Sequence, residues 1–118
     1  MNDSPSALPY QPLAVEELVQ WLADPNSGIQ LVDVREPAEL ALAQLPGFLN
    51  LPLSQFNDWG TDIRHHLEAD QPTVVMCHHG VRSAQMCQWL SQQGFSQLYN
   101  LTGGIDAYAL VDPTVPRY

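Results

Sequence analysis

Two short runs of apolar residues constrain the fold of this 118-residue chain more than any other feature. Residues 29–34 and residues 73–76 are almost continuously hydrophobic over the length of one strand. Such runs are typical of parallel strands that are covered by helices on both faces. Segments with helical spacing follow them, so strands and helices alternate along the chain. We therefore expect a three-layer α/β/α fold with a central, mainly parallel sheet.

The remaining helices and strands are predicted from the spacing of apolar residues and from the prolines and glycines that end helices. Residues 1–12 contain three prolines and few hydrophobic residues, so we expect a flexible tail there and one domain over residues 13–118. Beyond the two apolar runs, the pattern predicts helices at 15–22, 56–67 and 83–94, a short helical segment at 40–45, strands at 49–53 and 97–101, and a final short helix that begins at Gly103-Gly104.

The segment that follows the second apolar run carries the strongest chemical signal. Cys77 lies at the end of the predicted strand and a helix begins near Ser83, so residues 77–83 are predicted to form a tight loop. The free N–H groups of a helix N-terminus favour an anion there, and Gly80 allows the backbone to curl around it. Arg82 adds a permanent cation, which we expect to bind an anion or a carboxylate that faces the loop. Cys77 should therefore ionise near or below neutral pH and act as a nucleophile.

The loop Cys77-His78-His79-Gly80-Val81-Arg82-Ser83 resembles the active-site loop of the rhodanese family of sulfurtransferases. Residues 31–36 (LVDVRE) resemble the first-strand signature of that family, and residues 45–53 (LPGFLNLPL) its proline-glycine connection. Gly94-Phe95 and residues 99–105 (YNLTGGI) resemble its last strand and closing turn. Four separate motifs in the same order are far more specific than the cysteine loop alone. The resemblance implies a rhodanese-like domain over residues 13–118.

The same resemblance implies that sulfane sulfur is transferred in two steps. The Cys77 thiolate takes the outer sulfur of thiosulfate or a related small anionic donor as a persulfide. An acceptor then removes it, which is cyanide in an assay and a thiol or a carrier protein in the cell. No metal or organic cofactor is expected. The residues expected to bind the donor are His78, His79, Gly80, Val81, Arg82 and Ser83. A module that only carries persulfide for a partner enzyme stays an alternative.

Loop length separates sulfur transfer from phosphatase chemistry. Cysteine phosphatases hold phosphate in a loop whose arginine lies one position further from the cysteine than Arg82 lies from Cys77. The shorter loop leaves a smaller cradle, so we favour sulfur transfer over a cysteine phosphatase or an arsenate reductase-like enzyme.

Two pairs of adjacent histidines raise the question of a metal site. His78 and His79 follow Cys77, and His65 and His66 form a second pair, but no spacing in the chain matches a zinc motif. We therefore expect these histidines to line the loop or to be exposed. The sequence leaves open which of His78 and His79 faces the thiol.

Several other polar or reactive residues are expected to be structural. Cys87 lies at core spacing on the helix that follows the loop, so a packed and inert thiol is favoured over a resolving cysteine. Asp33 is expected to be buried at the end of its strand, where it accepts a nearby N–H. Arg35 and Glu36 are expected to form ion pairs at the surface or between loops.

The composition restricts the partners and the compartment. The net charge of −9 argues against nucleic acid and against anionic membranes as partners, and it favours basic partner proteins. The sequence contains no apolar run long enough for a membrane span, and it does not begin with the pattern of a signal peptide. Two cysteines make no disulfide framework, and a reducing compartment keeps a thiol usable. We expect a cytoplasmic monomer.

Overall fold

In the computed structural model, which describes residues 8–118, five strands form one parallel sheet in the order β1-β5-β4-β2-β3. The two apolar runs form β2 and β4, which pair from Gln30 opposite Thr73 to Asp33 opposite Met76. β4 is the middle strand, and its residues are completely buried. The strands are β1 (Gln11–Leu13), β2 (Gln30–Asp33), β3 (Leu49–Asn50), β4 (Thr73–Met76) and β5 (Leu98–Leu101).

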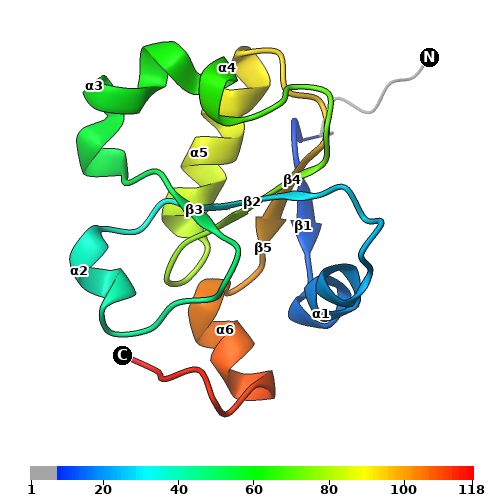
Figure 1. Cartoon of the computed structure of the whole chain (residues 1–118), viewed down its shortest axis with the longest axis vertical. Helices are drawn as coiled ribbons and strands as arrows, with labels where there is room; N and C mark the ends of the chain where they lie inside the picture. The colour runs from blue at the N-terminus through cyan, green and yellow to red at the C-terminus, as the bar shows by residue number, and fades with distance from the viewer. Residues whose placement is uncertain (1–7) are drawn as a thin grey trace.

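Helices cover both faces of the sheet, which confirms the three-layer fold (Figure 1). One face carries α1 (Val15–Ala23) and α6 (Gly104–Val111), and the other carries α3 (Phe56–Trp59), α4 (Ile63–His66) and α5 (Val81–Gln92). The remaining elements are α2 (Pro37–Leu40) and the two 3₁₀ turns η1 (Leu53–Gln55) and η2 (Gly60–Asp62). Among residues 8–118, no helix has the length and apolar character needed to cross a bilayer.

Side chains of β4 alternate between two hydrophobic cores. Val74 and Met76 pack in the core that includes residues of α1 and α6. Val75 and Cys77 belong to the opposite core, which includes residues of α3, α4 and α5. This alternation follows from the period of two in a strand, and it directs the Cys77 side chain to the face covered by α5.

The prediction of a tail through residue 12 needs correction at its end. Gln11 and Pro12 form β1 together with Leu13, and β1 pairs with β5 at the edge of the sheet. Proline is tolerated there because an edge strand needs hydrogen bonds on one side only. The earlier part of the expected tail, residues 1–7, lies outside the described residues.

The single helix predicted at 56–67 is wrong, because α3, η2 and α4 occupy this segment as separate short turns. The Phe56 ring lies where a Cβ of Gly60 would point, 2.8 Å from its position, and the Trp59 indole donates to the carbonyl of Pro52 at 2.9 Å. The Trp59 bond ties the segment to the residues before it, and the helix is interrupted where Gly60–Asp62 take 3₁₀ geometry. Glycine is a poor helix former, which fits a break at Gly60. The strand predicted at 49–53 is likewise shorter, because Pro52 has no N–H to donate.

Candidate active site

The loop between β4 and α5 lies at the carboxyl end of the central strand, where the ligands of parallel sheets bind. Only residues 77–80 separate the two elements. Gly80 has a φ of +102°, and a Cβ at this position would come within 3.3 Å of the Gly103 nitrogen. Glycine is therefore the residue that suits this turn.

The Cys77 sulfur accepts or shares two hydrogen bonds within this loop. The Gly80 N–H donates to Sγ at 3.0 Å, and the Ser83 hydroxyl lies 3.3 Å from it. Cys77 is only 1% exposed. Burial acts to raise the pKa of the thiol, but the Ser83 hydroxyl and the N–H groups of Ser83, Gly80 and His79 around the sulfur favour the thiolate and outweigh burial, so the pKa is lowered. The direction agrees with the expectation of a reactive thiolate.

Ser83 and Asn100 join the loop to strand β5. The Ser83 hydroxyl, which is fully buried, donates to Oδ1 of Asn100 in a short hydrogen bond. Since the hydroxyl has a single proton, this bond belongs to the protonated Cys77, and the proton must turn to Sγ to bond to the thiolate. Nδ2 of Asn100 donates to the carbonyl of Gly80 at 3.0 Å. The Asn100 side chain thus holds both Gly80, whose N–H donates to the sulfur, and the Ser83 hydroxyl beside the sulfur.

Helix α6 supports the loop from the other side. The N–H groups of Ile105 and Asp106 donate to the carbonyls of Cys77 and His78, at 2.9 and 3.1 Å. Gly104 has a φ of +63°, and a Cβ there would lie 2.4 Å from each of these two carbonyl oxygens. The Gly103-Gly104 turn therefore allows the first turn of α6 to rest directly on the cysteine loop.

Arg82 points to a carboxylate in this structure. Its Nη1 and Nη2 atoms lie 2.6 and 3.0 Å from the two oxygens of Glu39, a two-pronged ion pair. The hydrogen bonds from Arg82 lower the pKa of Glu39 to about 2, so the carboxyl is ionised at neutral pH. Of the two partners expected for Arg82, the carboxylate is observed, and contact with a donor anion stays a prediction.

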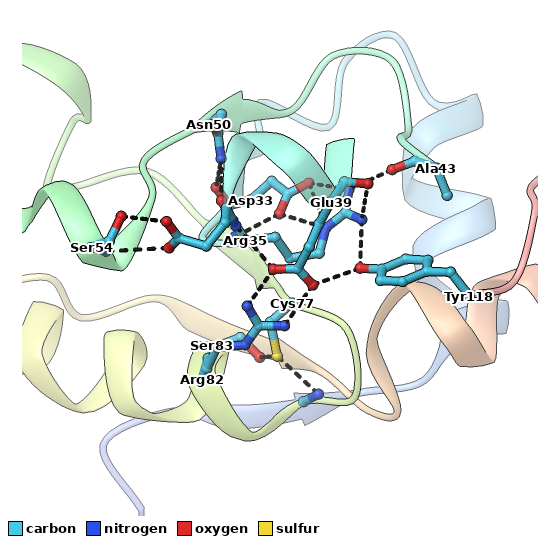
Figure 2. A network of polar contacts seen from close by, with 12 residues as sticks. Asp33, Arg35, Glu39, Ala43, Asn50, Ser54, Cys77, Arg82, Ser83 and Tyr118 are labelled. Carbon is cyan, nitrogen blue, oxygen red and sulfur yellow. Dashed lines mark hydrogen bonds and ion pairs between the residues drawn. The ribbon is translucent and has the colours of Figure 1, made fainter. Parts of the chain in front are cut away.

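Tyr118 connects this ion pair to a second, buried one (Figure 2). Its hydroxyl donates to Oε2 of Glu39 and accepts from Nη1 of Arg35, both at 2.8 Å. Arg35 also forms a salt bridge of 2.7 Å with Asp33, and its guanidinium donates to the carbonyl of Ala43 at 2.9 Å. Asp33 accepts the Arg35 N–H as expected, but the prediction of a surface or inter-loop ion pair for Arg35 is wrong. Arg35 is 0% exposed, and its donors are satisfied by partners inside the fold.

The two loop histidines pack against neighbouring rings instead of bonding to the sulfur. The His78 ring lies parallel to the Tyr118 ring at a centroid distance of 3.9 Å, and the His79 ring lies 3.9 Å from that of His78. His79 is exposed, and its Nδ1 is 3.8 Å from Asp106. Among the described residues, neither imidazole hydrogen-bonds to Sγ, and no three His, Cys, Asp or Glu side chains come together as a metal site would require.

The remaining predicted residues fall on either side of the loop. Val81 is exposed at the start of α5. Cys87 is 0% exposed in the core beside α5, and burial, with the charge of Cys77, raises the pKa of its thiol to about 12. The prediction of a packed thiol at Cys87 is therefore confirmed.

Three residues of the site were missed by sequence reasoning: Glu39, Asn100 and Tyr118. Glu39 and Asn100 carried a weak signal, because each is polar and lies at or after the carboxyl end of a strand on the same edge of the sheet as Cys77. Nothing in the residues around Tyr118 indicates that it contacts the loop.

Comparison with known proteins identifies the family. Residues 14–110 match the rhodanese-like domain family. The rhodanese-like/PpiC domain-containing protein 12, chloroplastic, of Arabidopsis thaliana is 48% identical over 93% of this chain, which spans 38% of that protein's length. A protein named sulfurtransferase from Allochromatium vinosum is 40% identical over 80% of this chain and 83% of its own length. Thiosulfate sulfurtransferase GlpE of Ectopseudomonas mendocina is 33% identical, over 75% of this chain and 78% of its own.

A solved structure gives the same result for the fold. A rhodanese-related protein from Thermoplasma volcanium superposes with a TM-score of 0.74 and 28% identity, covering 92% of this chain and 100% of that one. The fold expected from the sequence is confirmed, and the chain belongs to the rhodanese-like domain family.

Proposed function

We propose that the chain is a sulfurtransferase that moves sulfane sulfur from thiosulfate or a related donor to a thiophilic acceptor through a persulfide on Cys77. The observation that carries this proposal is the position of Sγ at the carboxyl end of β4, with the Gly80 N–H at 3.0 Å and the Ser83 hydroxyl at 3.3 Å. The Gly80 N–H, and the Ser83 hydroxyl once its single proton turns from Asn100 to Sγ, stabilise a negative sulfur. A negative sulfur is the form that attacks the donor and the form that the persulfide takes.

The first step transfers one sulfur atom to Cys77. The thiolate attacks the outer sulfur of thiosulfate, the S–S bond of the donor breaks, and sulfite leaves with the bonding electron pair. Cys77 then carries a persulfide whose terminal sulfur is negative. The lowered pKa of Cys77 supports this step because it keeps the attacking thiolate populated.

The second step restores the thiolate. The acceptor attacks the terminal sulfur, the Cys77 S–S bond breaks, and its electrons return to Sγ. Cyanide leaves as thiocyanate, and a thiol or a carrier protein leaves as its own persulfide. We propose a monomer that acts in the cytoplasm without a cofactor, since a reducing compartment keeps the thiol available.

The size of the loop favours this chemistry over phosphoryl transfer. Only residues 77–80 lie between β4 and α5, and Arg82 is already bound to Glu39. A phosphoryl group would need to be surrounded by loop donors, whereas sulfur transfer needs only one sulfur atom within reach of Sγ.

The test is a steady-state assay of thiocyanate formation from thiosulfate and cyanide, with Cys77→Ser as the control and an aryl phosphate as a competing substrate. We expect turnover by the parent, none by Cys77→Ser, and no phosphate release. Persulfide exchange with a protein thiol but without turnover of thiosulfate and cyanide would favour the carrier alternative. Phosphate release by the parent would overturn the proposal.

A further inference from the structure

The chain has few positive charges, and those near the thiol are neutralised. Its four basic residues are arginines, and there is no lysine. Arg35, Arg82 and Arg117 pair with the carboxylates of Asp33, Glu39 and Asp106. The fourth, Arg64, donates to the carbonyl of Gln93 near the far end of α5, about 18 Å from its N-terminus by the rise per residue of a helix. In the described part of the chain, no arginine at the cysteine loop is left without a carboxylate.

Glu39 is held firmly in its place against Arg82. Besides the two bonds from the guanidinium, Oε1 of Glu39 accepts the N–H of Glu36 at 3.0 Å. Oε2 accepts the Tyr118 hydroxyl at 2.8 Å, and Arg35 donates to that same hydroxyl from inside the core. An anion that takes over the two N–H groups that Arg82 directs to Glu39 must therefore displace a carboxylate with four hydrogen bonds, two of which do not involve Arg82.

The charges around the thiol disfavour a dianion. Arg82 and Glu39 cancel each other, so the Cys77 thiolate is stabilised by dipoles and not by a free cation. Thiosulfate would bring two further negative charges beside the thiolate and the Glu39 carboxylate. An alkyl persulfide carries the same transferable sulfur with at most one negative charge, so its repulsion is smaller.

On the basis of the proposed function, we infer that Glu39 is a specificity-determining residue. Glu39 holds Arg82, and Tyr118 is its second anchor. The loop therefore selects persulfide donors over dianionic donors such as thiosulfate.

Sulfur transfer from a persulfide follows the same course as transfer from thiosulfate. The Cys77 thiolate attacks the terminal sulfur of R–S–SH, the donor S–S bond breaks, and R–S⁻ leaves with the electron pair while the sulfur and its hydrogen stay on Cys77.

The experiment compares two donors by the rate at which sulfur appears on Cys77. Thiosulfate and a small alkyl persulfide with an otherwise uncharged side chain are each mixed with the reduced protein, and loading is followed by mass spectrometry. The ratio of the second-order rate constants, thiosulfate over persulfide, is measured for the parent, Glu39→Gln and Tyr118→Phe. Glu36→Gln is the matched control. It removes a carboxylate at the start of the same helix, α2, and this carboxylate bonds to Ser54 and not to Arg82.

We expect the parent to load faster from the persulfide. Glu39→Gln should raise the ratio by about five- to tenfold, because one negative charge is removed and Arg82 is released to the donor. Tyr118→Phe keeps the ring on His78 but removes one anchor of Glu39, so it should raise the ratio by a smaller factor. Glu36→Gln should leave the ratio at the parent value.

Several results would overturn the inference. They are a parent that loads faster from thiosulfate, a folded Glu39→Gln protein with the parent ratio, or an equal rise in Glu36→Gln. If circular dichroism shows that Glu39→Gln does not fold, Tyr118→Phe decides, and an unchanged ratio in that variant refutes the role of Glu39. Failure of both donors to load the parent would instead refute the proposed function.

Discussion

Replacing Gly104 by alanine tests how closely α6 supports the cysteine loop. The residue has a φ of +63°, which costs a residue with a Cβ roughly 1–2 kcal/mol. The new Cβ would also lie 2.4 Å from the carbonyl oxygens of Cys77 and His78, so backbone must move on one side of the contact. Relief of such overpacking costs about 1–3 kcal/mol more. We therefore expect Gly104→Ala to lower the free energy of unfolding by roughly 3 kcal/mol.

Gly28→Ala is the matched control for this prediction. Gly28 has nearly the same φ, +67°, but nothing lies within 4 Å of its Cβ position. Its substitution should cost only about 1 kcal/mol, so the difference between the two variants isolates the contact with the loop. Urea denaturation gives both free energies. The rate of Cys77 alkylation reports on the conformation of the loop, and we expect this rate to differ from that of the parent in Gly104→Ala but not in Gly28→Ala. Equal destabilisation by the two variants would refute the close packing of α6 against the loop.

Four further predictions concern the two thiols, Ser83 and Arg82. Cys87→Ala should lower the free energy of unfolding by about 1–2 kcal/mol in urea denaturation while keeping sulfur loading, and a loss of loading in the folded variant would indicate a two-thiol mechanism. Because the pKa of Cys77 is lowered, iodoacetamide should label Cys77 at a lower pH than it labels an ordinary thiol, and the rate should fall as the pH falls through that pKa. Cys87, whose pKa is raised to about 12, should stay unlabelled in the native protein. Ser83→Ala should move this midpoint to higher pH, and an unchanged pH profile would contradict the role of its hydroxyl. Arg82→Ala should slow the loading of sulfur from thiosulfate onto Cys77, because Glu39 then repels the donor. Adding Glu39→Gln to this variant should restore part of the rate. An unrestored rate would contradict the pairing of Arg82 with Glu39.

The sheet was predictable where apolar residues follow one another along a strand, and less so elsewhere. β2 and β4 were recognised because strands covered on both faces need apolar residues at nearly every position. β1 was missed because its polar residue and proline do not form such a run, and its pairing depends on β5, far away in the sequence. The segment 56–67 was predicted as one helix because the apolar spacing does not show the 3₁₀ turn at Gly60–Asp62 or the bond from Trp59 back to Pro52.

The site was predictable only as far as its contacts are local. Cys77, Gly80 and Ser83 lie in one loop, so their shared position at a strand end and helix start follows from neighbouring residues. Arg82 was identified, but its partner Glu39 is 43 residues away. The burial of Arg35 depends in part on Tyr118, 83 residues further along the chain, and no local pattern indicates that contact.

The central claim is that Cys77 carries the transferred sulfur, and one measurement tests it directly. The reduced protein is incubated with the alkyl persulfide or with thiosulfate, freed of excess donor, and analysed by intact and peptide mass spectrometry. We predict the gain of one sulfur atom, located on the peptide that contains Cys77, and its removal by cyanide with formation of an equal amount of thiocyanate. Cys77→Ser should gain none. An unchanged mass with both donors, or a sulfur atom located on Cys87, would contradict the account.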